Sequence, residues 1–280
     1  MNNKDITAVI TSFRSEKKII NCVKSLGRDI NVIVIENSND KDLKFQLEKE
    51  YSNLKCILSN ENLGYAKGNN LGLSIVKTRY ALIINPDAVV QHGAIDNFFS
   101  TAKKIKDFAI ISPYIQENVK NSHEKIAKGI SQVKNVKGFA MFLNLEQFKE
   151  VGFFDENFFI YFEEIDLCRR LIKKNKKIFL DTSIKINHDG GKSHEESINY
   201  EMEKSRNWHW MWSSFYFHKK HYGYLFAIIK IFPKFISSIL KTIFYKFSRN
   251  KEKKDIYYCR FKGILNSILL KKSWYRPKIY

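Results

Sequence analysis

The first 85 residues alternate between short apolar runs and stretches in which apolar positions recur with helical spacing. The apolar runs are rich in Val and Ile and are bounded by charged or turn-forming residues, which predicts buried strands. The predicted strands are 6–13, 31–40, 54–59 and 79–85, and the predicted helices are 15–26, 41–51 and about 66–77. This alternation is typical of a parallel sheet with helices on both faces.

The rest of the chain is less regular. Residues 136–144 predict a strand, 163–175 predict an amphipathic helix, and 176–189 predict one or two strands. From 198 to 222, a helical and aromatic-rich stretch leads into the C-terminal part of the chain.

Charge divides the chain into a near-neutral body and a basic end. Residues 1–198 carry a net charge of +5 and residues 199–280 carry +14, from a total of +19. A basic segment favours an anionic partner such as nucleic acid, a membrane surface or a phosphorylated substrate. We therefore expect an α/β domain over 1–205 and a helical basic tail over 206–280.

The cysteines and the N-terminus indicate the compartment. The four cysteines form no CxxC pair, which argues against a zinc ribbon or a disulfide framework and is typical of a reducing compartment. The N-terminal stretch MNNKDITAVITSF is too polar, and its apolar run too short, for a signal peptide. These observations predict a cytoplasmic protein.

Polar motifs follow the predicted strands, and in open α/β sheets ligands bind beyond the carboxyl ends of the strands. Asn85-Pro86-Asp87 ends a clean apolar strand, so Asp87 would project from that edge. A carboxylate there could share a hard cation such as Mg²⁺ or Mn²⁺ with a diphosphate. The alternative is that Asp87 helps to cap the next helix, which is the commoner role of an isolated motif of this kind.

Two further motifs have alternatives of the same kind. The Gly-rich stretch 64–72 precedes a predicted helix and could let the backbone approach a phosphate. It matches neither GxGxxG nor a P-loop, and an ordinary turn with Asn caps explains it more simply. His188 follows a strand and precedes two glycines, where it could bind a metal or a phosphate, although a lone His is more often structural.

Two acidic residues, Glu163 and Glu164, follow five apolar or aromatic residues in FFIYFEEIDLCRRL, residues 158–171. One interpretation is a helix start, because acids in the first turn complement the helix dipole. The other is a general base whose pKa is raised by desolvation in a partly apolar pocket. Periodicity does not separate the two.

Six motifs, taken together and in order, identify a family. They are AVITSFRSE, VIVIENSND, NENLGYAKGNNLG, YALIINPDAVV, the segment from VKGFAMF to DLCRRL, and INHDGGKS. This combination resembles the family-2 glycosyltransferases, and within them the rhamnosyltransferase-like branch. The resemblance implies a GT-A fold, which is a Rossmann-like mixed sheet with helices on both faces, here followed by a basic, mainly helical tail.

The resemblance also implies roles for individual residues. Those expected to bind the sugar nucleotide are Thr11, Ser12, Phe13, Glu36, Asn37, Asn62, Gly64, Lys67, Gly68, Asn69 and Asn85. Asp87 would bind the metal, and His188 would complete the metal site. The pair Glu163-Glu164 matches the family's Glu-Asp pair, whose second member is the catalytic base.

Two positions depart from the family pattern. Glu36 and Glu164 stand where Asp is usual, and the extra methylene moves each carboxylate about 1.5 Å farther from the backbone. A catalytic group misplaced by about 1 Å can cost roughly 100-fold in rate. Glu163 and Asp166 therefore remain alternatives to Glu164 as the base.

The implied activity is a metal-dependent, inverting hexosyl transfer, with rhamnose as a candidate sugar. The donor would be a nucleoside-diphosphate sugar and the acceptor a saccharide or lipid-linked molecule, in cell-surface polysaccharide or lipopolysaccharide synthesis. The cofactor would be Mg²⁺ or Mn²⁺, and nucleic acid is not an expected partner. One alternative is an NAD-dependent Rossmann protein, which the missing GxGxxG disfavours. Another is a non-catalytic basic protein that binds membrane or nucleic acid.

The tail contains an apolar segment, 222–247, whose longest charge-free run is eight residues, far short of the roughly 20 needed to span a bilayer. On a helix, Lys230, Lys234, Ser237 and Lys241 fall on one narrow face. This pattern suits a helix in the membrane interface, with Lys toward anionic headgroups. A helix packed on the body, with solvated lysines, is the alternative. We expect peripheral association with the inner face of the cell membrane.

Overall fold

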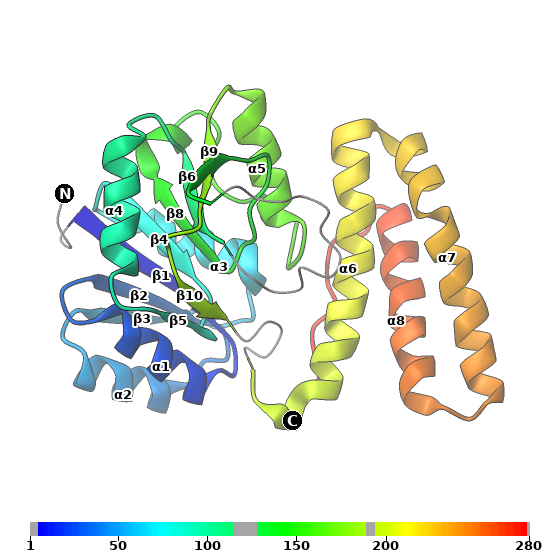
Figure 1. Ribbon diagram of the computed structural model, residues 1–280. Helices are drawn as coiled ribbons and strands as arrows, with labels where there is room; N and C mark the ends of the chain where they lie inside the picture. The colour runs from blue at the N-terminus through cyan, green and yellow to red at the C-terminus, as the bar shows by residue number, and fades with distance from the viewer. Residues whose placement is uncertain (1–4, 115–127, 189–193, 279–280) are drawn as a thin grey trace. The chain divides into compact units, whose positions relative to one another are not determined.

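The structure, a computed structural model, describes residues 5–114, 128–188 and 194–278. The chain forms two compact units (Figure 1). The α/β unit comprises Met1–Leu63, Lys67–Phe154 and Glu164–Glu195, and the helical unit comprises Gly64–Ala66, Asp155–Glu163 and Glu196–Tyr280. The helical unit thus includes three segments from inside the predicted α/β domain, Gly64–Ala66, Asp155–Glu163 and residues 196–205. The functional division at residue 205 stays a prediction.

The α/β unit contains the strands and the first five helices, apart from the first residues of α3 and α5. The strands are β1 (Ile6–Ser12), β2 (Asn31–Glu36), β3 (Leu54–Leu58), β4 (Tyr80–Ile84), β5 (Ala88–Val90), β6 (Ile110–Pro113), β7 (Ile130–Gln132), β8 (Ala140–Asn144), β9 (Ile178–Asp181) and β10 (Ile186–His188). The helices are α1 (Glu16–Leu26), α2 (Lys41–Glu50), α3 (Gly64–Ser74), α4 (Ala94–Lys104) and α5 (Glu163–Lys173), with the 3₁₀ helix η2 (Leu145–Phe148).

Eight of these strands form one sheet in the order β3-β2-β1-β4-β8-β6-β9-β7, and β10 pairs with β5 in a second sheet. Strands β3, β2, β1 and β4 run parallel, as predicted, and lie side by side in Figure 1. Strand β8 pairs antiparallel with β4. The large sheet is therefore mixed, which confirms the predicted fold class.

Helices cover both faces of the sheet. Alternate residues of each strand point to opposite sides, so both faces carry apolar side chains that the helices bury. On one face, Ile6, Ala8 and Ile10 of β1 join buried residues of α1, α2 and α4 in a single core. On the other face α3 lies so close to β1 that a Cβ at Gly72 would collide with Val9.

The Gly-rich stretch 64–72 lies within α3, which begins two residues before the predicted start at about residue 66, so the alternative of an ordinary turn is wrong. Gly68 and Gly72 are four residues apart and so lie on the same face of the helix, the face that packs against the sheet. Glycine is a poor helix former, yet it is the residue that allows this close approach. The four-residue spacing of these glycines, which does not match GxGxxG, thus reflects the packing of α3 against the sheet.

The helical unit contains α6 (Asn199–Tyr222), α7 (Tyr224–Phe247) and α8 (Lys251–Ile268), preceded by the 3₁₀ helix η3 (Glu196–Ile198). This confirms the mainly helical C-terminal region. Helices α6 and α8 lie very close together, since a Cβ at Gly263 would collide with the carbonyl of Trp208. In the part of the chain that the structure describes, no helix combines the length and the apolar character needed to cross a bilayer.

Candidate active site

The Asn85-Pro86-Asp87 motif forms the turn that connects β4 to β5. The Ala88 N–H donates to the Asn85 carbonyl at 3.1 Å, and proline suits the second position of such a turn. The Asn85 N–H donates to the Phe139 carbonyl at 2.8 Å, which fixes the turn at the carboxyl edge of the sheet. Helix α4 instead has Gly93 as its N-cap, with no side-chain cap, so the alternative role of Asp87 as a helix cap is wrong.

The second, two-stranded sheet brings His188 to Asp87. In the β5–β10 pair, His188 lies opposite Ala88, the residue after Asp87. The His188 Nε2 atom lies 3.3 Å from Asp87 Oδ1 and 3.4 Å from Asn85 Nδ2. Its ring stacks on Phe139 with 4.7 Å between ring centroids. Residues about 100 positions apart thus form one compact group.

This group has the properties of a cation site. Asp87 is buried, with 6% of its surface exposed, and neither of its carboxylate oxygens has a hydrogen-bond partner. Nδ1 of His188 also has none. Burying a carboxylate without donors is costly, and a divalent cation would offset that cost. Within residues 5–114, 128–188 and 194–278 no group of three His, Cys, Asp or Glu side chains could hold a metal. Further ligands would come from substrate phosphates and water.

Five predicted nucleotide-binding residues gather where β1 and β2 end. A Cβ at Gly68 would lie 2.6 Å from Thr11 Cγ2 and 3.5 Å from Asn37 Nδ2. The Asn37 N–H donates to the Ser12 carbonyl at 2.9 Å. Ser12 and Asn69 are fully buried, and the hydroxyls of Thr11 and Ser12 have no hydrogen-bond partner. The structure brings these five residues together.

Glu36 supports the loop after β2. It is fully buried, and its carboxylate accepts hydrogen bonds from the Ser38 hydroxyl at 2.6 Å and from the Asp40 N–H at 2.8 Å. The Ser38 hydroxyl oxygen accepts in turn from the Arg14 N–H at 2.8 Å, which joins the loops after β1 and β2. The carboxylate therefore folds back on its own loop, and its predicted contact with a nucleotide stays a prediction.

The remaining predicted nucleotide-binding residues are spread more widely. Phe13 and Asn62 are half-buried at the ends of β1 and of the loop before α3, and Lys67 is exposed on α3. Gly64 is the first residue of α3 and belongs to the helical unit, with a φ of +75°. Of the acidic pair, Glu163 also belongs to the helical unit.

Glu164 lies in the first turn of α5, and its carboxylate accepts hydrogen bonds from its own backbone N–H and from that of Ile165. Burial raises the pKa of the Glu164 carboxyl above its ordinary value, even though these N–H groups oppose the shift. Its Oε2 atom has no hydrogen-bond partner. The two interpretations of the acidic pair therefore describe one arrangement, a helix start that holds a desolvated carboxylate.

Asp166 has a different environment. Its side chain is fully buried and accepts a hydrogen bond from Arg170 Nε at 2.8 Å. The guanidinium of Arg170 also donates to the carbonyls of Val151 and Phe153. Asp166 thus neutralises an arginine that ties α5 to the preceding chain, which favours a structural role over that of a base.

The aromatic residues before the acidic pair are anchored on α6 within the helical unit. Asp155 accepts hydrogen bonds from the Tyr216 hydroxyl at 3.0 Å and from Lys220 Nζ at 2.7 Å. The Ser213 hydroxyl donates to the Ile160 carbonyl at 2.9 Å. The aromatic run before the acidic pair is evident in the sequence, but the sequence did not predict that it would contact α6.

The last two residues of this segment have strained backbones. Tyr161 and Phe162 have φ angles of 71° and 69°, a region that bulky residues rarely occupy and that costs of order 1–3 kcal/mol per residue. Both rings pack on Trp210, at centroid distances of 5.1 and 5.3 Å. Contacts to α6 therefore hold the backbone one residue before the acidic pair.

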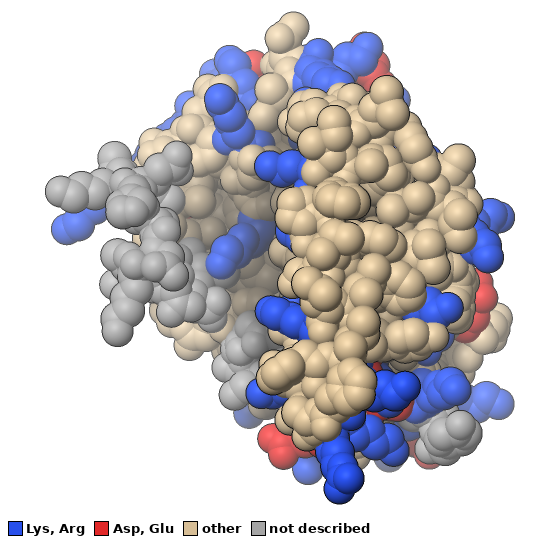
Figure 2. Space-filling view, turned by 90° about the vertical axis from the view of Figure 1, so that its right-hand side faces the viewer, with Lys and Arg blue, Asp and Glu red and all other residues tan. Residues whose placement is uncertain are grey.

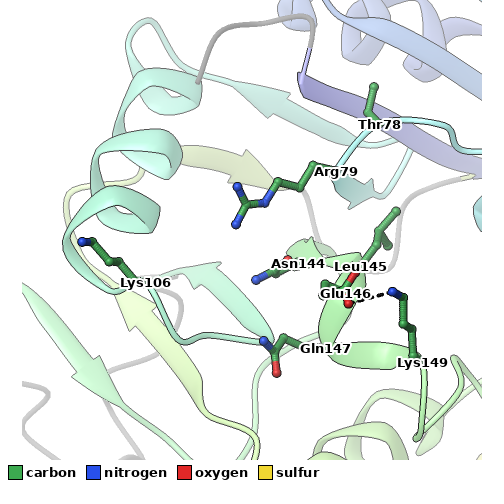
Figure 3. Close-up of a pocket in the computed structure, with 8 residues that line it drawn as sticks. All are labelled: Thr78, Arg79, Lys106, Asn144, Leu145, Glu146, Gln147 and Lys149. Carbon is green, nitrogen blue, oxygen red and sulfur yellow. Dashed lines mark hydrogen bonds and ion pairs between the residues drawn. The ribbon is translucent and has the colours of Figure 1, made fainter.

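A pocket of about 490 Å³ lies at the opposite edge of the sheet (Figure 3). Its lining includes Arg79, at the amino end of β4, and Asn144, at the end of β8 and opposite Tyr80 in the register. Lys106 and Lys149 also line it, and Lys149 pairs with Glu146. Thr11, Asn37 and Asp87 lie at or just after the carboxyl ends of β1, β2 and β4, so this pocket lies at the other end of these strands.

Comparison with known proteins identifies the family. Residues 7–170 match the family described as Glycosyl transferase family 2, which is more than half of the chain. The chain belongs to this family. The match covers β1 to α5, and so all the predicted site residues except His188.

This glycosyl transferase family 2 chain is similar to a hexosyltransferase and to a rhamnosyltransferase. The low-salt glycan biosynthesis hexosyltransferase Agl10 of Haloferax volcanii is 25% identical over 198 residues, which are 62% of this chain and 64% of that protein. The chain thus spans just under two thirds of Agl10. The rhamnosyltransferase WbbL of Escherichia coli K12 is 27% identical over 199 residues, 58% of this chain and 75% of that protein.

Solved structures share the fold. The mannosyltransferase PcManGT of Pyrobaculum calidifontis, solved with GDP-Man and Mn²⁺, superimposes with a TM-score of 0.58 at 10% sequence identity. The superposition covers 96% of this chain and 88% of that one. The fold is therefore GT-A, as predicted.

Proposed function

We propose that this chain is a metal-dependent, inverting hexosyltransferase. It moves a sugar from a nucleoside-diphosphate sugar to a saccharide or lipid-linked acceptor in cell-surface polysaccharide or lipopolysaccharide synthesis. The observation that carries the proposal is the pair Asp87–His188 at the carboxyl edge of the sheet, in a chain of glycosyl transferase family 2. The rhamnosyltransferase relative makes rhamnose the first sugar to test.

Asp87 and His188 would hold the divalent cation, Mg²⁺ or Mn²⁺. When bound, that cation neutralises negative charge on the leaving nucleoside diphosphate. The residues fit it, because a buried carboxylate lacking hydrogen-bond donors and an imidazole 3.3 Å away form an oxygen and nitrogen donor set. The cluster around Thr11, Asn37 and Gly68 would bind the nucleotide.

Glu164 would act as the general base. A carboxylate with a raised pKa accepts the proton of an attacking acceptor hydroxyl more readily than an ordinary one. Attack on the face of the sugar opposite the diphosphate inverts the anomeric configuration. Asp166, paired with Arg170, would keep α5 in place.

We also propose that the reaction takes place in the cytoplasm, on the inner face of the cell membrane. A lipid-linked acceptor would be presented there, and the 82 C-terminal residues carry a net charge of +14.

The test is a thermal-shift panel of dTDP-, UDP- and GDP-linked sugars, with and without Mn²⁺. A ligand at about 100 times its Kd stabilises the folded protein by about 2.7 kcal/mol, which raises Tm by several degrees. We expect at least one nucleotide sugar to do so in the presence of Mn²⁺. If none does, and the protein instead binds DNA in a salt-sensitive manner, the non-catalytic alternative is correct.

The anchoring of the aromatic segment leads to a prediction about catalysis. Trp210→Ala removes the ring that packs on Tyr161 and Phe162, so the strained backbone before Glu164 can relax. Since a shift of about 1 Å in a catalytic group can cost roughly 100-fold, we expect kcat to fall by about 10- to 100-fold with little change in the donor KM.

The matched control is Trp274→Ala. Trp274 is also partly exposed in the helical unit, but its ring contacts Trp208 and Tyr275 and not the segment before Glu164. Equal losses of kcat in both variants would show that general destabilisation, and not positioning of Glu164, explains the effect.

A further inference from the structure

Helix α7 buries one face within the helical unit and leaves the opposite face uncovered. The buried positions are Ala227, Ile231 and Ser238, and two of them contact apolar residues of α6 and α8. The uncovered positions recur every three or four residues along the helix. They are Leu225, Ile229, Phe232, Ile236, Leu240, Ile243 and Phe247, which we call the α7 stripe.

The α7 stripe is too apolar for an ordinary solvated helix face. Leu225, Ile229 and Phe247 expose 78%, 73% and 81% of their surfaces, and the other four expose between 38% and 61%. Phe226 and Phe244, also exposed, widen it at its edge. At about 1.5 Å per residue the stripe is roughly 33 Å long. Continuous exposed apolar surfaces of this kind mark sites of protein or membrane interaction.

The charges around the stripe indicate which partner covers it. Helix α7 contains four lysines and no acidic residue, and residues 224–280 contain 14 Lys and Arg against two acidic residues. On a helical projection, Lys246 lies beside the stripe, whereas Lys230, Lys234 and Lys241 lie closer to the buried face, and Lys241 contacts Tyr257 of α8. Figure 2 shows a broad uncharged surface with Lys and Arg side chains, and a few Asp and Glu side chains, along its margins.

We infer that the α7 stripe docks on an anionic lipid bilayer, with the helix lying in the plane of the interface. Apolar side chains would enter the acyl boundary while Lys246 and other basic side chains of the helical unit contact lipid phosphates. Each basic residue near such a surface contributes attraction that salt weakens. This surface is not the lysine face predicted from the sequence: the apolar side chains make the insertion, and Lys230, Lys234 and Lys241 lie nearer the buried side of α7. The inference rests on the proposed membrane location and not on the transfer reaction.

Co-sedimentation of the full chain with vesicles tests the inference. The vesicles contain phosphatidylcholine alone, or about three parts phosphatidylcholine to one part phosphatidylglycerol. We expect binding to the mixed vesicles, weakened at high salt, and much less binding to phosphatidylcholine alone. The double variant Ile229→Ser/Leu240→Ser removes two apolar side chains that would enter the lipid. It should weaken binding to the mixed vesicles roughly 100-fold.

The matched control is Phe45→Ser/Ile172→Ser, which removes two exposed apolar side chains from α2 and α5 of the α/β unit. Equal vesicle binding by the wild type and the stripe variant would overturn the inference. A wild type that does not bind vesicles but forms a dimer would also overturn the inference, provided that the stripe variant is monomeric. The stripe would then be the contact between two copies of the chain. The stripe variant should keep the thermal shift with nucleotide sugars, so loss of that shift in the wild type would count against the transferase proposal alone.

Discussion

Glu164→Gln is expected to abolish sugar transfer while donor binding survives. A general base contributes typically 100- to 10,000-fold to a rate, so kcat should fall by about that factor. Glutamine keeps the shape of the side chain and can still accept hydrogen bonds from the backbone N–H groups of residues 164 and 165. Single-turnover transfer assays, with thermal shift by the donor as the measure of binding, check the prediction. Unchanged turnover would place the base elsewhere.

The pH dependence of the wild type gives a second readout. Because burial raises the pKa of Glu164, the carboxylate that accepts the proton is lost as pH falls through this raised value. The acidic limb of the rate profile should therefore lie at a higher pH than the ordinary glutamate pKa of about 4.3. This limb should disappear in the residual activity of Glu164→Gln.

Stability should change with pH in a way that also identifies the base. A carboxyl with a raised folded-state pKa destabilises the fold when it is ionised, so the cost is present above that pKa and absent below the unfolded-state value. Glu164→Gln should accordingly be at least as stable as the wild type at neutral pH and equal to it in acid. Asp166→Asn should behave in the opposite way: it leaves the Arg170 charge without its buried partner, which costs about 3–5 kcal/mol. A variant that loses activity but keeps its stability thus identifies the base, whereas a variant that loses both identifies a structural residue.

Asp87→Asn is expected to remove metal-dependent donor binding. A metal that stabilises the leaving group contributes several kcal/mol to the transition state, so kcat/KM should fall by at least about 100-fold. The Mn²⁺-dependent part of the thermal shift with the donor should vanish.

Asp96→Asn is the matched control, since Asp96 is an exposed acid in the first turn of α4 and its replacement changes the net charge equally. It should retain the full Mn²⁺-dependent shift. An Asp87→Asn variant that keeps this shift would show that the cation, if one is used, binds elsewhere. His188→Gln should weaken the shift less, because a neutral ligand contributes less than a carboxylate.

The parallel half of the sheet, and the edge formed by the carboxyl ends of its strands, can be predicted from local sequence patterns. Apolar β-branched runs predict β1 to β4, and because parallel strands end at one edge, the residues after them must gather there. This is why Thr11, Asn37 and Asp87 could be placed from the sequence. Strands β5, β7 and β10 have three residues each, too few to show a periodicity, and no element was predicted where α4 and β6 form.

The sequence by itself thus determined the family, the order of the first strands, the edge that carries the site, and the basic character of the C-terminal helices. The tertiary structure decided what depends on contacts between distant residues. Pairing of β5 with β10 brings His188 to Asp87, and contacts with α6 hold the aromatic residues that precede Glu164. Packing against α6 and α8 decides which side of α7 is buried. Apolar residues surround much of that helix, so local periodicity could not reveal its exposed face.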